Sequence, residues 1–188
     1  MKQPIFNKAL RILLTTNALI LFAAAMFGPI TAIFVEKVGG DLLDASYAGT
    51  IFALSAGFMT LLSGKYSDKI KENELIVVFG YILMGIGFLL YTIVDSVKFL
   101  LLVQIIIGFG EAIYSPAFDA AYSKHLDNHC AGREWGAWES TNYFTLGAGA
   151  FVGGLIANFF GFDALFITMG SLCLVSAGYI YILPRSVI

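Results

Sequence analysis

Long apolar runs separated by short polar turns make up nearly the whole chain. The runs cover residues 9–34, 45–63, 75–94, 97–123, 136–160 and 162–183. A helix rises about 1.5 Å per residue, so each run is long enough to cross a hydrocarbon core of ~30 Å. The pattern predicts an all-α integral membrane protein in which residues 1–188 form a single domain of six transmembrane helices.

Local signals set the boundaries of these helices. Three successive alanines in the run 9–34 resemble a signal-peptide cleavage site, but the run continues well beyond them, which favours a retained helix. The outer loop 36–44 leads into the second helix, and Asp44 or Ser46 is placed to cap it. Gly161 is expected to end the fifth helix immediately before the sixth begins.

Positive charge is divided unevenly between the two sets of loops. Lys37 and Lys98 lie on one side of the predicted topology, and the other nine of the 11 basic residues lie on the side of the two termini. Cytoplasmic loops of membrane proteins are enriched in Lys and Arg. Both termini are therefore expected to be cytoplasmic, most simply at the plasma membrane.

Composition agrees with a lipid bilayer as the surroundings of the chain. It is 59% hydrophobic and only 13% charged, whereas soluble domains average about 25% charged residues. The net charge of −2 and the absence of a basic face argue against a nucleic-acid partner. Cys130 and Cys173 fall in a predicted inner loop and inside an apolar run, so both are expected to be free thiols.

No motif in the sequence indicates an enzyme or a metal site. The G-x-S-x-G elbow, the Walker loop and the H-E-x-x-H helix are all absent from the sequence. His125, Asp127, His129 and Cys130 crowd one loop, but zinc sites usually draw their ligands from two separated pairs on rigid turns. We expect no metal and no cofactor.

Acidic residues within the predicted spans are the first candidates for function. Glu111 lies near the middle of the fourth span, Asp119 lies nearer its inner end, and Glu139 lies just inside the fifth span. The apolar residues of the fourth span favour insertion by roughly 4–7 kcal/mol, and two central ionised acids would cost about 5–7 kcal/mol. The fourth span should therefore bury its acids against protein or a water-filled cavity.

Polar and small residues of the fourth span recur at helical spacing. They form one stripe, with Asp119 at its edge: Gln104, Gly108, Glu111, Ser115 and Tyr122. This stripe indicates the lining of a path for a small solute, with Glu111 as a proton or cation carrier. Asn17 and Asn142 are further candidates for the path. The alternatives are a neutral or paired carboxyl for each acid and an interhelical hydrogen bond for each asparagine.

Glycines of the fifth span indicate close helix packing. Gly149 and Gly153 have the four-residue spacing that lets helix backbones approach each other, and Gly154 adds a third small position.

Three motifs give the chain a family resemblance. The turn after the second span has Gly64, Asp68 and Lys69 where major facilitator superfamily (MFS) transporters have a glycine, an aspartate and a base, although it then lacks their second glycine and basic pair. The fourth span has Gly108 and Gly110, assigned here to helix packing, but Gln104 stands in place of the family's arginine. The fifth span ends its motif with the same glycine pair as drug antiporters, without their proline. The chain resembles the amino-terminal six-helix half of an MFS transporter.

The resemblance implies a secondary transporter half that works by alternating access and is built as a 3+3 inverted repeat. Gly64, Asp68 and Lys69 would then belong to a gating loop. Family members usually have twelve spans, so a second six-helix unit is the expected partner: a second copy, a separately encoded half or the remainder of a longer chain. The alternative is a membrane assembly subunit that does not transport.

Overall fold

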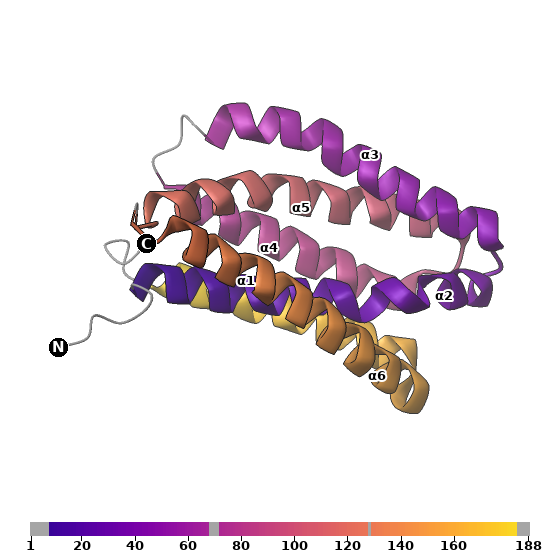
Figure 1. The fold of residues 1–188 in the computed structure, drawn as a ribbon. Coiled ribbons are helices and arrows are strands. Elements are labelled where there is room, and N and C mark those ends of the chain that lie inside the picture. Colours follow the sequence, from indigo (N-terminus) through magenta and orange to yellow (C-terminus); the bar gives the residue numbers. More distant parts are fainter. Residues whose placement is uncertain (1–7, 68–71, 128, 184–188) are drawn as a thin grey trace.

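The described part of the chain is entirely helical in its regular structure. The computed structural model describes residues 8–67, 72–127 and 129–183 (Figure 1). In chain order the elements are α1 (Lys8–Phe27), η1 (Gly28–Ile30), α2 (Thr31–Lys37), α3 (Leu42–Ser67), α4 (Asn73–Leu90), η2 (Tyr91–Ile93), α5 (Val97–Lys124) and α6 (Ala131–Ile182), where η marks a 3₁₀ turn. Five helical segments are long and apolar enough to cross a membrane, the first of them running from Lys8 to Lys37. The predicted all-α membrane architecture is thus confirmed at this level.

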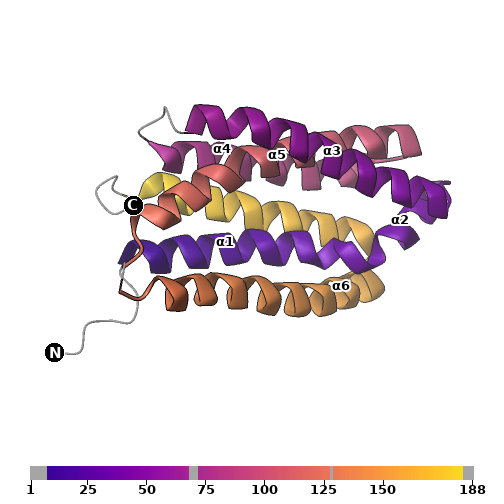
Figure 2. The ribbon, with the colours of Figure 1, turned by 45° about the horizontal axis from the view of Figure 1, so that its top comes forward.

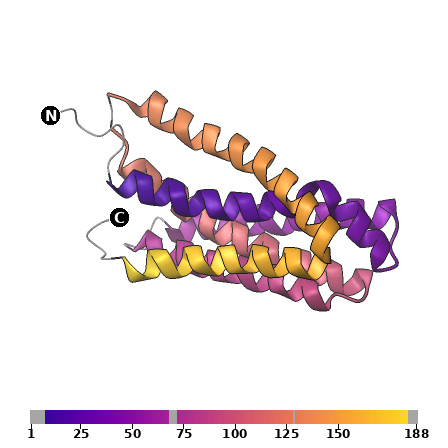
Figure 3. The same ribbon diagram turned by 90° about the horizontal axis from the view of Figure 1, so that it is seen from below.

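The last element, α6, is broken near its middle. Its 52 residues include Gly161, whose φ of 86° and ψ of 173° lie outside the helical region. Glycine adopts such a positive φ at no steric cost because it lacks a Cβ. The break divides α6 into a first arm, residues 131–160, and a second arm, residues 162–182, and the second arm runs back along the first (Figure 3).

Helix α1 lies between the two arms of α6, and α4 packs against both α5 and α6 (Figure 2). Helix α3 lies at the edge of the bundle and packs chiefly on α5. The ends at Lys8, Ser67 and Lys124 gather at one end of the bundle, together with both ends of α6. We call this the basic end, because among the described cations only Lys37 and Lys98 lie at the opposite end.

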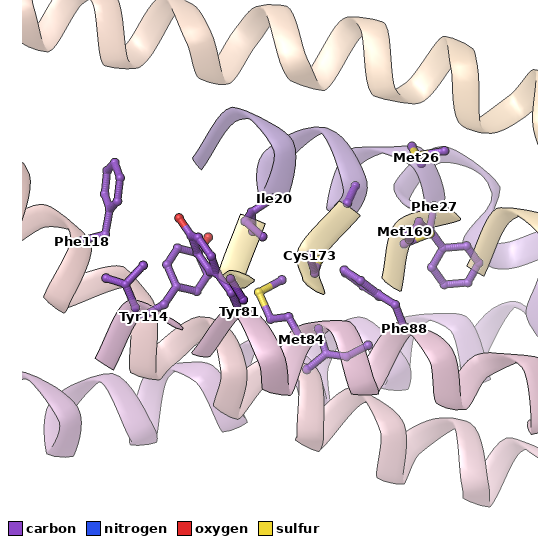
Figure 4. Close-up of a cluster of buried hydrophobic side chains, with 14 of the residues drawn as sticks. Ile20, Met26, Phe27, Tyr81, Met84, Phe88, Tyr114, Phe118, Met169 and Cys173 are labelled. Carbon is purple, nitrogen blue, oxygen red and sulfur yellow. The ribbon is translucent and has the colours of Figure 1, made fainter. Parts of the chain in front are cut away.

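Large side chains form a core where α4, α5 and α6 meet. Tyr81 and Met84 of α4 meet Tyr114 of α5 and Cys173 of the second arm of α6 (Figure 4). The rings of Tyr81 and Tyr114 stand 4.9 Å apart in an edge-to-face arrangement. Near the opposite end, aromatic rings pack against one another with centroids 4.8–5.9 Å apart: Phe27, Phe34, Tyr91, Phe162 and Phe166. Burial of these rings fixes α1, α2, η2 and α6 together.

The first apolar run does not form the single helix expected over residues 9–34. Pro29 lacks a backbone N–H and cannot continue the hydrogen-bond ladder of α1. The chain therefore passes through the 3₁₀ turn Gly28–Ile30 before α2 begins. Gly28 of this turn lies beside a cavity in the bundle.

The predicted cap of the second span is wrong. Helix α3 begins at Leu42, and the carboxylate of Asp41 accepts hydrogen bonds from the backbone N–H groups of Leu43 (2.8 Å) and Asp44 (2.9 Å). The carboxylate of Asp44 in turn accepts the N–H of Asp41 at 3.0 Å. The two acids form a reciprocal capping box, in which Asp44 holds the third position instead of the cap.

Candidate functional site

A cavity of about 360 Å³ lies among α1, α3, α4 and α5, in the half of the bundle away from the basic end. Its lining comes from seven elements: Ala24, Phe27, Gly28, Thr31, Ala45, Gly49, Phe52, Met84, Phe88, Tyr91, Gln104, Ile107 and Glu111. Gly28, in the 3₁₀ turn after Phe27, is one of the lining residues. The volume is sufficient for a small organic molecule.

Helix α5 supplies the polar side of the cavity. Gln104 and Glu111 are seven residues apart, which is close to two helical turns, so both side chains point to the same face. Gln104 is 8% exposed, and Glu111 is half-buried. No residue of the described ranges forms a hydrogen bond or an ion pair with the Glu111 carboxylate. A carboxylate at mid-membrane depth is costly unless something neutralises it, so this group is available to a proton or a cationic ligand.

Aromatic rings make up much of the rest of the lining. Phe27 and Tyr91 contact each other at a centroid distance of 5.0 Å, and Phe52 and Phe88 add further rings from α3 and α4. Among the residues that the structure describes, no Lys, Arg or His lines the cavity. The cavity therefore combines several aromatic surfaces with a single carboxylate, an arrangement that suits an apolar molecule bearing positive charge.

The remaining predicted path residues lie outside the lining of this cavity. Asn17 is 3% exposed and accepts a hydrogen bond from the Tyr81 hydroxyl at 3.2 Å, so it joins α1 to α4 within the core. Asp119 is half-buried two turns beyond Glu111, toward the basic end of α5. Glu139 is exposed and Asn142 half-buried on the first arm of α6. The structure thus brings together Gln104 and Glu111, but not the other four.

Comparison with known proteins identifies the family. The sequence profile of the Major Facilitator Superfamily matches residues 13–187. The chain belongs to the major facilitator superfamily. The resemblance inferred from its motifs is confirmed.

Several characterised and uncharacterised MFS proteins are similar to this chain. An uncharacterized MFS-type transporter of Methanocaldococcus jannaschii is 26% identical over 84% of this chain and 40% of the relative. Multidrug resistance protein MdtG of Dickeya zeae is 24% identical over 92% of this chain and 43% of the relative. The multi-drug resistance efflux pump PmrA of Streptococcus pneumoniae is 28% identical over 86% of this chain and 41% of the relative. The chain therefore spans less than half the length of these relatives.

Solved structures agree on the fold. The POT family transporter PepTSo superposes with a TM-score of 0.76 at 17% identity, covering 95% of this chain and 37% of that one. An auto-inhibited POT family peptide transporter gives a TM-score of 0.73 at 16% identity, covering 92% and 36%. At such low identity the likeness concerns the MFS fold alone.

The three glycines predicted to pack the fifth span differ in how closely other helices approach them. On the first arm of α6, a Cβ at Gly149 would lie 2.7 Å from the Phe22 carbonyl oxygen of α1, and one at Gly153 would overlap Met26. At Gly154, the same Cβ would meet no atom of the described chain within 4 Å. The first two glycines thus permit close approach of α1, whereas Gly154 faces open space.

The two glycines of α5 face different neighbours. A Cβ at Gly108 would lie 2.9 Å from the Phe52 carbonyl oxygen of α3. A Cβ at Gly110 would lie 2.9 Å from the Met84 backbone nitrogen of α4. Sequence reasoning missed the partner of Gly110: Gly80 on α4 is equally tight, since its Cβ would lie 2.8 Å from the Gly110 carbonyl oxygen. Paired glycines in adjacent predicted spans are the signal that could have found it.

Of the three predicted gating-loop residues, Gly64 falls within the described part of the chain. Gly64 lies in the last turn of α3, where a Cβ would meet no described atom within 4 Å, and Asp68 and Lys69 lie outside the described residues. In the loop before α6, the Glu134 carboxylate accepts the Asp127 backbone N–H at 2.8 Å, and the Tyr122 hydroxyl donates to the Glu134 carbonyl at 2.6 Å. These contacts brace the loop.

In the described ranges no three His, Cys, Asp or Glu side chains are grouped to hold a metal ion.

Sequence reasoning missed the apolar part of the cavity. Phe27, Phe52 and Phe88 carry no motif, and aromatic residues are abundant throughout the chain. The available signal was the Gly28-Pro29 pair inside an apolar run, because a break at membrane depth is tolerated where it is buried in protein or lines a cavity.

Proposed function

We propose that this chain is a six-helix half of an MFS secondary transporter, which moves a small solute through the cavity of α1, α3, α4 and α5 by alternating access. The observation that carries the proposal is the unpartnered Glu111 carboxylate facing an aromatic cavity at mid-membrane depth. A carboxyl in such a place alternates between a proton and a cationic ligand when the two compete for it. This competition would couple solute movement to a proton gradient.

The lining favours a lipophilic cation as the solute. Aromatic rings of Phe27, Phe88 and Tyr91 offer faces for cation–π contact, Gln104 offers hydrogen bonds, and Glu111 offers the counter-charge. The names of two relatives, a multidrug resistance protein and a multi-drug efflux pump, agree with a solute of this kind. An apolar wall with few directional contacts also suits ligands of varied shape.

Six membrane crossings with both termini in the cytoplasm are part of the proposal. Each arm of α6 is long enough to cross separately, at 30 and 21 residues from the ranges 131–160 and 162–182. The excess of Lys and Arg at the basic end favours this end as the cytoplasmic one, in the plasma membrane. The six spans would form one domain as a 3+3 inverted repeat, as in other proteins of this kind.

A second six-helix unit is the proposed partner, with the lipid bilayer covering the remaining surface. Two elements expose large apolar side chains along much of their length. On α3 these are Leu42, Leu43, Tyr47, Leu54, Phe58, Leu61 and Leu62, and on the first arm of α6 they are Tyr143, Phe144, Leu146, Phe151, Leu155, Phe159 and Phe160. The partner would close the solute path between these faces, whether it is a second copy, a separate chain or a further part of the same polypeptide.

A flux experiment tests the function. The full gene product is expressed in bacterial cells, and the accumulation of the fluorescent cation ethidium is followed with and without a proton gradient. We expect gradient-dependent flux for the native protein. Glu111→Gln removes the negative charge while keeping the shape, so it should abolish the dependence on the gradient. Asp95→Asn is the matched control, because Asp95 is an exposed acid in the turn before α5.

Two results would contradict the proposal. Equal gradient-dependent flux in Glu111→Gln and Asp95→Asn would remove Glu111 from the mechanism. No flux of cationic, anionic or neutral lipophilic probes by a folded native protein would favour an assembly subunit that does not transport.

A further inference from the structure

Helix α5 contains a proline that leaves one of its backbone carbonyls without a helical partner. Pro116 lies inside α5 and has no N–H to donate to the carbonyl of the residue four positions earlier. This residue is Ala112, which directly follows the candidate carrier Glu111. A carbonyl left unpaired at membrane depth costs free energy unless a neighbouring group donates to it.

Ser63 of α3 supplies this donor. Its hydroxyl donates to the Ala112 carbonyl across the seam between α3 and α5. The same oxygen lies 3.3 Å from the Thr60 carbonyl of its own helix, a common position for a serine hydroxyl in a helix. A serine hydroxyl carries one hydrogen, so it donates well to only one of the two carbonyls at a time.

The seam between α3 and α5 holds α3 to the bundle. Toward its middle, Gly108 lets the backbone of α3 approach, with the Phe52 carbonyl oxygen 2.9 Å from where a Cβ would stand. Toward the basic end, the Ser63 hydroxyl makes a direct hydrogen bond from α3 to the backbone of α5. Ser63 lies one residue before Gly64, where the predicted gating loop begins.

We propose that Ser63 is a positioning residue that docks the basic end of α3 on the proline break of α5 and thereby fixes the turn that carries Glu111. The hydroxyl changes acceptor when the helices part. In the docked state it donates to Ala112, and in the detached state it returns to Thr60, so the hydroxyl keeps a partner in both. The Ala112 carbonyl loses its partner on detachment, which favours the docked state. The role in transport rests on the proposed function, whereas the docking itself does not.

A double-mutant cycle tests the docking directly. Spin labels are attached to Leu61→Cys on α3 and Ser123→Cys on α5, in full gene product that carries Cys130→Ser and is reconstituted in lipid. The distance distribution between the labels gives the ratio of docked to detached molecules. Ser63→Ala should lower this population ratio about fivefold, which is the effect of one hydrogen bond of ordinary net strength. Pro116→Ala restores an N–H for Ala112, so adding Ser63→Ala to it should leave the ratio unchanged.

Two control variants separate docking from general damage to α3. Thr60→Ala removes a hydroxyl that bonds only within its own helix, to Ala56 at 2.8 Å, and should leave the ratio unchanged. Ser63→Thr keeps the hydroxyl and should retain the native ratio. The proposal is overturned if Ser63→Ala has the same effect with and without Pro116, or if Thr60→Ala lowers the ratio equally.

Flux measured on the same variants separates this proposal from the proposed function. We expect Ser63→Ala to slow flux and the double variant to match Pro116→Ala alone. If the effect of Ser63→Ala on the docked-to-detached ratio depends on Pro116 but the native protein shows no flux, transport is refuted and the docking role is retained. If the native protein shows flux but Ser63→Ala has the same effect on the ratio with and without Pro116→Ala, only the docking role is refuted.

Discussion

Gly153 offers a quantitative test of how α1 packs against the first arm of α6. A Cβ placed on Gly153 would stand 2.5 Å from the Met26 Cα and still nearer to its carbonyl oxygen, whereas ordinary contacts begin at 3.4 Å. The obstacle is backbone, which cannot rotate away, so Gly153→Ala must separate the helices by about 1 Å. Overpacking of this kind costs about 1–3 kcal/mol, and the better helix propensity of alanine offsets up to ~1 kcal/mol. We expect a net loss of about 1–2 kcal/mol.

Gly154→Ala is the matched control. It makes the same chemical change one residue later, where a Cβ meets open space within the described chain. The assay is thermal unfolding of purified protein in detergent. For a chain of this size, the loss should lower the midpoint of Gly153→Ala by about 2–8 °C, while Gly154→Ala stays level or rises. A lower midpoint for Gly154→Ala than for Gly153→Ala would refute the packing of α1 on α6.

Two further substitutions test contacts that hold the bundle together. Gly161→Ala forces a side chain onto a φ of 86° and a ψ of 173°, so we expect a loss of about 1–3 kcal/mol and a lower unfolding midpoint; an unchanged midpoint would mean that the turn between the arms of α6 relaxes without strain. Tyr81→Phe leaves the Asn17 side-chain carbonyl without its 3.2 Å donor, so the expected loss is about 0.5–1.5 kcal/mol, measured in the same assay. The effect of Tyr81→Phe should vanish when Asn17 is already leucine, and persistence of the full loss would contradict a role for the hydrogen bond.

The hydrophobic pattern was sufficient to predict the helical segments but not their irregularities. The fourth run, expected over residues 97–123, forms α5 over Val97–Lys124. The first run contains a proline whose consequence depends on whether neighbouring helices leave space for a 3₁₀ turn, which a single segment does not reveal. The cap of α3 was misplaced because Asp41 and Asp44 are chemically alike, and only backbone geometry decides which one holds which position.

The candidate site was predictable on one helix and not across helices. Gln104 and Glu111 share a face because helical periodicity puts them there, and the structure places both at one cavity. Asn17 has the same polarity, but its direction depends on the rotation of α1 against α4, which no local pattern fixes. Similarly, Gly153 and Gly154 are adjacent and identical in type, and only the position of α1 makes one of them a contact.

The proposed mechanism requires Glu111 to exchange a proton for a cationic solute in the aromatic cavity. The most direct measurement uses inside-out membrane vesicles with an imposed pH gradient, reported by a pH-sensitive dye, to which a lipophilic cation is added. We expect the cation to dissipate the gradient in vesicles with the native protein and with Asp95→Asn, and to leave it unchanged with Glu111→Gln. Equal dissipation by the native protein and Glu111→Gln would contradict it.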